Sequence, residues 1–225
     1  MAHFARNMPH LSGLLTRSSF RGRIGLMGGS FNPPHLGHLA MAKRARALAG
    51  LDKIMWLVSP QNPHKSSAEM ANFDARFTAC QKMAEPHGWL IVSDFETHIQ
   101  MQSGHQTQPV TSAETLMHLR RLLPLSQLIW IMGADNLIQF HKWDNHDVIK
   151  DAVDLLILGR PGYSYRALAS EPRHQLGPRN LPRRLGKSSG KYKTSGFGAT
   201  GKWAFDTAAH NLLSATQLRH SGKGL

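Results

Sequence analysis

Residues 28–39 read Gly-Gly-Ser-Phe-Asn-Pro-Pro-His-Leu-Gly-His-Leu. They follow a short apolar run at 24–27 and lead into a segment rich in helix-forming residues. This order predicts a strand, a glycine-rich turn and a helix. Glycines at a strand end let the backbone approach a ligand closely, and the free N–H groups of a helix start favour phosphate. We therefore expect a phosphate-binding turn here.

Two histidines stand at the start of the expected helix. His35 and His38 lie three residues apart, so their rings share one face of a helix that begins near His35. Imidazoles in that place can donate hydrogen bonds to phosphate oxygens, more strongly when protonated. Taken singly, each part also reads as a tight turn or an idle surface histidine, but the ordered combination favours a binding site.

The whole run resembles the G-G-x-F-[DN]-P-x-H-x-G-H signature of the nucleotidyltransferase superfamily, which transfers AMP or CMP from a nucleoside triphosphate. It is neither a Walker A motif, which needs Gly-Lys-Ser/Thr, nor the dinucleotide fingerprint G-x-G-x-x-G. The resemblance implies that both histidines are catalytic. It also implies that ATP is bound by Gly28, Gly29, Ser30, Phe31, His35 and His38.

Bulk composition narrows the class of protein. The 225 residues suffice for one well-buried domain and are few for two. The formal net charge of +13 favours partners that carry phosphate, either nucleotides or nucleic acid. A single cysteine, Cys80, excludes an internal disulfide and fits a reducing cytoplasm. No apolar run is long enough to span a membrane, so we expect a cytoplasmic protein.

Apolar runs alternate with helical segments along the chain. We expect strands at 24–27, 53–58, 89–92, 128–132, 153–158 and 203–205. We expect helices at 36–49, after a cap at Asp74, after the capping box at 111–114, and at 214–219. Buried strands between helices indicate an α/β protein, with a Rossmann-like doubly wound parallel sheet and helices on both faces, which is also the nucleotidyltransferase fold. Its ligands should lie beyond the carboxyl ends of the strands, at a switch point in strand order.

Three segments do not follow the alternation of strands and helices. We expect one domain at 23–219, with one of these segments as a loop inside it. Residues 1–22 contain arginines but no acidic residue, and we expect a disordered extension rather than a transit peptide. Residues 170–202 hold many basic residues with Gly, Pro and Ser, and Glu171 is their single acid. We expect a flexible basic loop there, as a solvated insertion rather than a nucleic-acid patch. Residues 220–225 are expected to be a frayed tail.

Further segments narrow the resemblance to bacterial nicotinate-nucleotide adenylyltransferases, which make deamido-NAD from ATP and nicotinate mononucleotide. Residues 60–65 match a P-x-x-P-x-K segment, which implies that Lys65 binds substrate phosphate and assists catalysis. Residues 133–136 with Trp143 resemble a G-A-D-N…W segment. Asp135 would then accept hydrogen bonds from ribose hydroxyls of ATP, and Trp143 would stack on the pyridine ring. The alternatives are a helix cap for Asp135 and a core aromatic for Trp143.

Residues 111–116 partly match a Y-T-x-x-T-L segment. Thr111 and Ser112 replace its first two residues, whereas Thr115 and Leu116 agree with it. The resemblance implies that Thr111, Ser112 and Thr115 bind the substrate, since free N–H groups at a helix start suit a nicotinate carboxylate. A carboxamide there would cost ~1–3 kcal/mol in mismatched donors. Without the usual tyrosine, the preference for acid over amide stays open.

Two more segments point to the triphosphate. Residues 214–219 resemble the closing S-x-T-x-[IV]-R motif, which implies ATP binding by Ser214 and Thr216 and a catalytic role for Arg219. Residues 160–163 match a family segment near the adenine, which implies that Arg160 also binds ATP.

The implied reaction is transfer of AMP from ATP to nicotinate mononucleotide, in NAD biosynthesis. The acceptor phosphate attacks the α-phosphorus in line, so no protein nucleophile is needed. Mg²⁺ is expected to come with ATP, held by its oxygens and by water rather than by a set of protein ligands. The alternatives within the superfamily are transfer of AMP to nicotinamide mononucleotide or to pantetheine phosphate, and transfer of CMP from CTP.

An RNA-binding protein is the alternative from another class. The basic residues between 173 and 187 lack interleaved aromatics, which speaks against it as the main function. The sequence predicts no oligomeric state.

Overall fold

The computed structural model describes residues 22–60, 70–102, 109–160, 162–170, 173, 176 and 203–207. The segments expected to be an extension, a basic loop and a tail lie almost wholly outside these ranges. So does the helix expected at 214–219.

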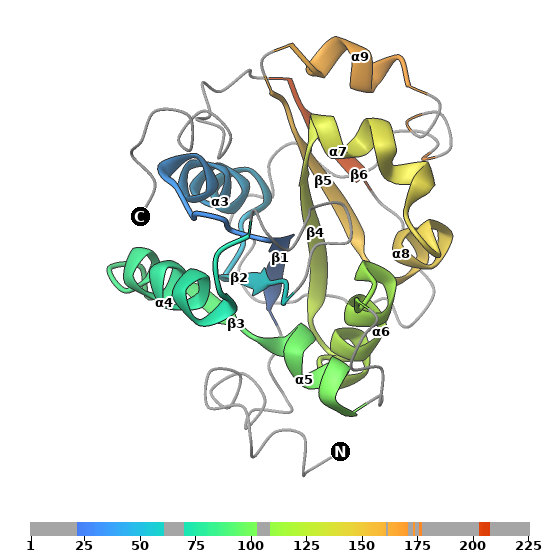
Figure 1. Cartoon of the computed structure of the whole chain (residues 1–225). Coiled ribbons are helices and arrows are strands. Elements are labelled where there is room, and N and C mark those ends of the chain that lie inside the picture. The colour runs from blue at the N-terminus through green and yellow to red at the C-terminus, as the bar shows by residue number, and fades with distance from the viewer. Residues whose placement is uncertain are drawn as a thin grey trace.

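Within the described ranges, one sheet of six parallel strands has the order β3-β2-β1-β4-β5-β6 (Figure 1). Its strands are β1 (Arg23–Gly29), β2 (Lys53–Val58), β3 (Leu90–Ser93), β4 (Gln127–Gly133), β5 (Asp154–Leu158) and β6 (Trp203–Asp206). The chain winds outward from β1 to β3, then returns to the other side of β1 and continues from β4 to β6. This is the predicted doubly wound sheet, and its switch point lies between β1 and β4.

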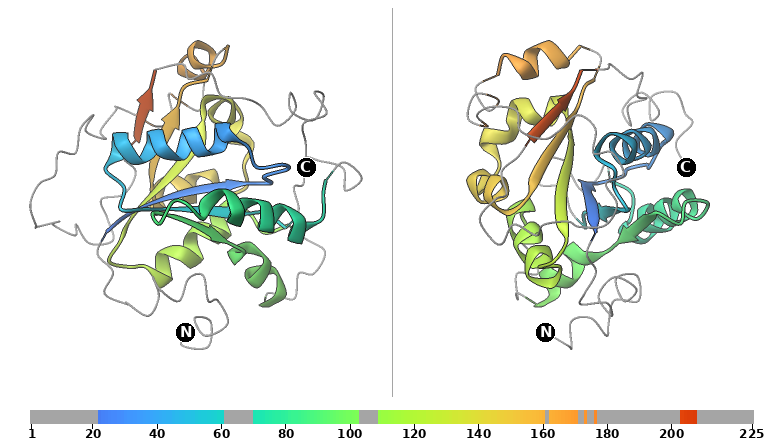
Figure 2. Two further views of the ribbon diagram at one scale, coloured as in Figure 1. Left: turned by 90° about the vertical axis from the view of Figure 1, so that its left-hand side faces the viewer. Right: turned by 180° about the vertical axis from the view of Figure 1, so that it is seen from behind.

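Helices cover both faces of the sheet (Figures 1 and 2). One face, which we call the α3–α4 face, is covered by α3 (Leu36–Ala49) and α4 (Phe73–Ala84). The opposite α5–α9 face is covered by α5 (Phe95–Gln102), α6 (Ser112–Leu122), α7 (Ala134–Gln139), α8 (His146–Ala152) and α9 (Ser164–Leu168), with the short 3₁₀ helix η2 (Phe140–Lys142).

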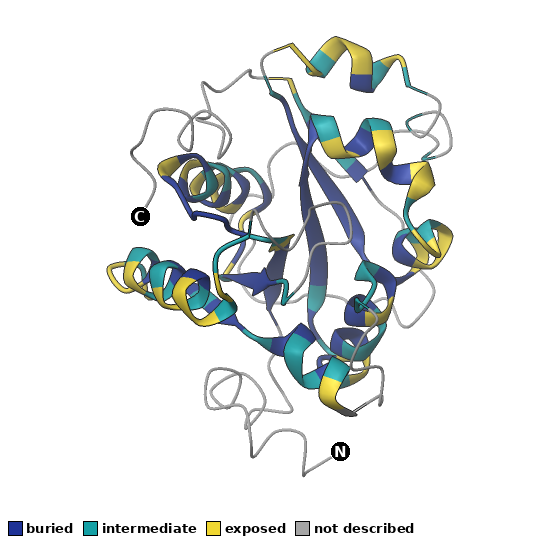
Figure 3. Cartoon of the chain, viewed as in Figure 1, coloured by how far each residue is buried: buried dark blue, intermediate teal, exposed yellow. Residues whose placement is uncertain are grey.

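Alternate strand residues face these two layers, as the period of two in a strand requires. In β4, Trp130 packs into the core of the α5–α9 face, whereas Ile129 and Ile131 pack into that of the α3–α4 face. The strands are therefore buried on both sides, and the helices expose only their outer surfaces (Figure 3). This explains why the strand sequences read as continuous apolar runs.

The ends of two helices show which local sequence signals predict a helix boundary correctly. The helix predicted at 36–49 is α3, and Gly50 ends it with a φ of 58°, in the left-handed region that glycine favours. The predicted cap at Asp74 is wrong. Asn72 caps α4, because its side-chain oxygen accepts the Asp74 N–H at 2.8 Å and Asp74 already lies in the first turn. Among the described residues, no helix has the length and apolar character needed to cross a membrane.

Candidate active site

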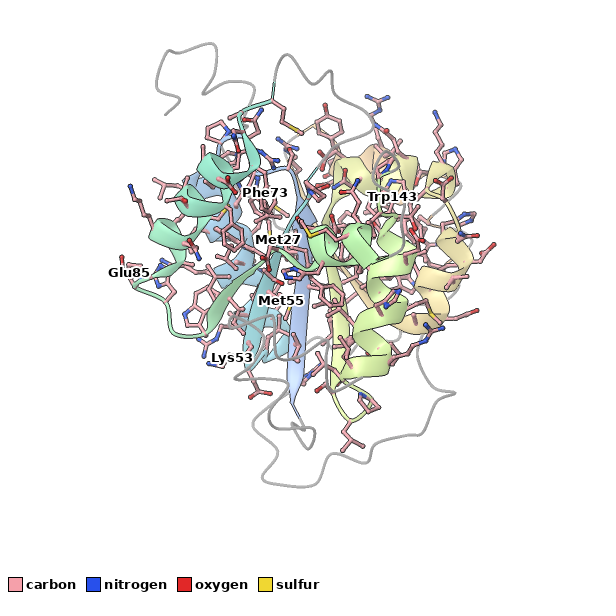
Figure 4. The ribbon with its side chains drawn as sticks, turned by 60° about the horizontal axis from the view of Figure 1, so that its bottom comes forward. Met27, Lys53, Met55, Phe73, Glu85 and Trp143 are labelled. Carbon is pink, nitrogen blue, oxygen red and sulfur yellow. The ribbon has the colours of Figure 1, made fainter. Side chains whose placement is uncertain are left out.

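The residues expected in the site follow the ends of the central strands. Gly28 and Gly29 end β1 at the switch point, Asp135 comes just after β4, and Arg160 just after β5. All four therefore lie at the carboxyl edge of the sheet, where doubly wound proteins bind their ligands. Figure 4 shows Trp143 among the helices of the α5–α9 face, Phe73 on α4 of the opposite face, and Met27 of β1 in the sheet that separates them.

Gly28 is required by packing inside the protein. A Cβ at this position would lie 2.6 Å from Cη2 of Trp130, on the neighbouring strand β4. The glycine backbone is exposed at the strand end, so a ligand can also approach it. The sequence reasoning gave only the second role, because the contact with Trp130 depends on the pairing of β1 with β4.

The two histidines form a reciprocal cap at the start of α3. Nδ1 of His35 accepts the Gly37 N–H at 3.1 Å, and Nδ1 of His38 accepts the His35 N–H at 3.2 Å. Because Nδ1 is the acceptor in both rings, each neutral imidazole carries its proton on Nε2. The ring centroids lie 3.8 Å apart, which confirms that the rings share one face. The cap thus uses Nδ1 of both rings and places the proton of each neutral ring on Nε2.

Burial keeps His35 neutral. Desolvation by burial and, to a smaller extent, the nearby positive charge of Arg160 lower the pKa of its imidazole to about 4. The stronger donation expected of a protonated ring therefore does not apply to His35 near neutral pH, since it would have to take up a proton in a buried place beside a cation. A neutral Nε2–H still donates one hydrogen bond.

Phe31 packs against the ring of His38. Its φ of 44° lies in the left-handed region, which costs a non-glycine residue roughly 1–2 kcal/mol. The buried ring stacks on Trp56 with 5.0 Å between centroids and contacts the His38 ring at 4.9 Å. This packing compensates for the backbone strain. We infer that Phe31 supports the site through His38.

Asp135 and Arg160, both expected to bind ATP, bind each other. Nη1 of Arg160 donates to Oδ2 of Asp135 at 2.5 Å. Asp135 lies in the first turn of α7, where Gly133 is the N-cap residue and no side chain caps the helix, so the capping alternative for Asp135 is excluded. A Cβ on Gly133 would collide with the Asp135 carboxylate. The charge of Arg160 also acts on His35.

Trp143 follows η2 and is half-buried. Its ring meets those of Phe140 and Trp130 edge to face, at 5.5 and 6.4 Å between centroids. Trp130 in turn fills the space beside Gly28, so a line of contacts joins Trp143 to the strand end of the phosphate-binding turn. The partial burial fits both readings of Trp143, a core aromatic and a platform for a planar ring.

The start of α6 is built by the predicted capping box. The Glu114 N–H donates to Oγ1 of Thr111 at 3.2 Å, and the Thr111 N–H donates to Oε2 of Glu114 at 3.0 Å. Ser112 opens the helix. Thr115 is fully buried, and its hydroxyl faces Glu96 and the Thr111 carbonyl. The expected direct contact between Thr115 and a substrate is therefore replaced by a supporting role.

Arg76 was missed by the sequence reasoning. Its buried guanidinium donates to the carbonyls of Ser30, Ser59, Pro60 and Ala71 at 2.5–3.1 Å. It thereby ties the glycine-rich turn after β1 to the end of β2. The available signal was the spacing of Arg76, Cys80 and Ala84, which are the buried residues of α4.

Four expected site residues lie outside the described residues: Lys65, Ser214, Thr216 and Arg219. The described part of the chain contains no group of three or more His, Cys, Asp or Glu side chains that could hold a metal ion.

Comparisons with known proteins agree with this geometry. The cytidylyltransferase-like family matches residues 26–221. A probable nicotinate-nucleotide adenylyltransferase of Cereibacter sphaeroides is 34% identical over 204 residues, covering 89% of this chain and 97% of the relative. Another protein of that name, from Parvibaculum lavamentivorans, is 40% identical over 149 residues, covering 66% of this chain and 69% of the relative.

A solved structure shares the fold. The nicotinic acid mononucleotide adenylyltransferase of Plasmodium falciparum, complexed with NaAD, superposes with a TM-score of 0.61 at 14% identity, covering 89% of this chain and 83% of that one. The family match and the identity to the bacterial relatives both extend over most of the chain. The chain therefore belongs to the cytidylyltransferase-like family and, within it, to the nicotinate-nucleotide adenylyltransferases.

Proposed function

We infer that this protein transfers AMP from ATP to nicotinate mononucleotide, giving deamido-NAD and pyrophosphate in the biosynthesis of NAD. The observation that carries the inference is the reciprocal cap of His35 and His38, which fixes both rings as Nε2–H donors at the start of the helix that follows the exposed strand-end glycine Gly28. Donors arranged in this way match the oxygens of a phosphate that bridges two nucleotides.

The chemistry requires positioning more than activation. The acceptor phosphate is ionised near neutral pH and attacks the α-phosphorus in line with the departing pyrophosphate. His35 and His38 donate from Nε2 to the phosphoryl oxygens on which charge develops. Arg160, held by Asp135, adds positive charge nearby, and Asp135 accepts hydrogen bonds from the ribose hydroxyls. Gly28 to Phe31 form the backbone wall of the ATP site.

On the acceptor side, Trp143 stacks on the pyridine ring and the first turn of α6 receives the nicotinate carboxylate. Thr111 and Ser112 belong to that turn. The resemblance supports roles for Lys65, Ser214, Thr216 and Arg219 in binding and neutralising the triphosphate and pyrophosphate. Residues 23–219 would form one catalytic domain, in line with the family match at 26–221.

Enzymes of this family generally use a divalent metal ion. We propose that the ion is Mg²⁺, which arrives as part of the ATP substrate and keeps several waters and phosphate oxygens as ligands. Because the reaction consumes ATP, we also propose that the protein works in the cytoplasm.

The test is a pyrophosphate-release assay with ATP and Mg²⁺, offering nicotinate mononucleotide and its amide analogue separately. We expect a clear preference for the acid, since an amide at the start of α6 would place its own donors against free N–H groups at a cost of ~1–3 kcal/mol. Equal use of both acceptors would contradict the specificity, and release with neither would contradict the function.

A further inference from the structure

Ser59, just after β2, joins three parts of the site. Its N–H donates to the Gly29 carbonyl at 3.0 Å, and its own carbonyl accepts from Arg76 at 2.9 Å. Its side chain hydrogen-bonds the carboxyl group of Glu96. Ser59 therefore links the end of the phosphate-binding strand β1 to the α5–α9 face.

Glu96 lies in the first turn of α5, which packs against β2 and α6 (Figure 1). The residue is only 6% exposed. Besides Ser59, its partner is the Thr115 hydroxyl, which lies 3.3 Å from Oε1. A buried carboxyl group with two neutral partners is disfavoured as an anion.

Thr115 has one hydroxyl proton and two acceptors within reach. Oγ1 lies 3.1 Å from the Thr111 carbonyl as well as 3.3 Å from Glu96. When Glu96 is protonated, its O–H can donate to Oγ1 of Thr115, whose own proton then goes to the Thr111 carbonyl. When Glu96 is ionised, the carboxylate and the carbonyl compete for that one proton. The Thr111 carbonyl accepts the Thr115 N–H at 3.1 Å in both forms, and in the protonated form the Thr115 hydroxyl adds a second hydrogen bond to that carbonyl.

We propose that Glu96 is a positioning residue which, in its protonated form, holds the start of α6 against the end of β2 and so sets the affinity of the site for the acceptor nucleotide. The proposal rests on the proposed function, because it assigns the start of α6 to the acceptor. Neither Glu96 nor Thr115 needs to touch the substrate. Their effect passes through Thr111, the N-cap residue of α6.

The electrostatic surroundings agree with this role. Burial raises the pKa of Glu96 to about 7, while the bonds from Ser59 and Thr115 lower it by less. The described elements packed against α5 carry charged or titratable side chains: Lys53 on β2, and Glu114, His118, Arg120 and Arg121 on α6. None of these contributes to the shift, and Asp94 and His98, which flank Glu96, pair with each other. Burial therefore favours the protonated form of Glu96 up to a higher pH than for an exposed carboxyl group.

The test compares the wild type with Glu96→Gln, whose uncharged amide copies the protonated acid, by measuring KM for each substrate from pH 6 to 8.5. We expect the KM of the wild type for nicotinate mononucleotide, relative to that of the variant, to rise about tenfold across this range. The KM for ATP should change equally in both proteins. The phosphate of nicotinate mononucleotide also titrates in this range, but it affects the KM of both proteins equally and therefore cancels in the ratio of the two KM values.

Ser59→Ala provides a second variant. It removes a hydrogen bond that favours the anion, so the midpoint of the KM change should move to higher pH. A constant ratio of the two acceptor KM values, or an equal effect on KM for ATP, would overturn the proposal. If Glu96→Gln does not fold, the proposal would be overturned by a Ser59→Ala variant in which the midpoint of the KM change stays at the wild-type pH.

Hydrogen exchange separates this proposal from the proposed function. In the wild type, protection of the Glu114 and Thr115 amides at the start of α6 should decrease as the pH passes about 7, beyond the intrinsic pH dependence of exchange. In Glu96→Gln it should not. The role proposed for Glu96 requires this change in protection even if the protein uses another acceptor. If the protein shows the change in protection but forms no deamido-NAD, only the proposed function is contradicted.

Discussion

Nδ1 of His38 accepts the backbone N–H of His35 at 3.2 Å, and this bond makes a side chain that we propose to be catalytic part of a helix cap. The hydrogen bond that caps the start of α3 also fixes the orientation and the tautomer of the His38 ring. We expect ¹⁵N NMR spectra at neutral pH to show both His35 and His38 as Nε2–H tautomers. A Nδ1–H signal from either ring would contradict the cap.

Burial is the larger cause of the lowered pKa of His35, and the positive charge of Arg160 is the second. The pKa of His35 is about 4 in the folded protein and ordinary when unfolded, so folding favours the neutral ring. Its contribution to stability is complete above about pH 6.5 and is lost as the pH falls toward 4. Arg160→Ala should raise the pKa of His35, measured by NMR titration, and make this loss of stability on acidification smaller. The exposed Arg166 supplies the control, since Arg166→Ala should leave the titration unchanged.

Gly28→Ala should destabilise the protein by about 1–3 kcal/mol, because its Cβ would lie 2.6 Å from Trp130 and the indole cannot move without disturbing Trp143. The measurement is the free energy of unfolding in urea. Gly88→Ala is the matched control, because an added Cβ there meets no atom within 4 Å. Equal stability of the two variants would show that Trp130 does not require the glycine.

Arg76→Lys keeps the charge but loses the planar set of donors that reaches four carbonyls. We expect a loss of about 2–4 kcal/mol in unfolding free energy, because buried carbonyls are left without partners. The KM for ATP should also rise, since Ser30 belongs to the phosphate-binding turn. Arg121→Lys, at an exposed position of α6, should change neither quantity. Normal stability and KM in Arg76→Lys would mean that the charge alone is sufficient.

Much of the fold was predictable because its signals are local. The strand Lys53–Val58 and the helix Leu36–Ala49 have the predicted bounds, since continuous apolar residues mark one and Gly50 ends the other. The short helices α7, α8 and α9 were not predicted. They have five to seven residues each, too few for a helical period to stand out.

The site divides in the same way. The pair His35 and His38 could be predicted from spacing, and the capping box of Thr111 and Glu114 from residue type. The roles of Arg76, Glu96 and Trp130 could not, because each depends on which loop or strand lies beside it in the folded chain. A lone arginine or glutamate in a helix carries no sign of such neighbours.

The most direct test of the account is the rate of deamido-NAD formation from ATP and nicotinate mononucleotide by the wild type and by His38→Ala, at saturating substrate. We expect the wild type to be active and the variant to lose ~10²–10³-fold in kcat, as for removal of a donor to developing charge. Similar rates in the two proteins would contradict the claim that the paired imidazoles stabilise the transferred phosphoryl group.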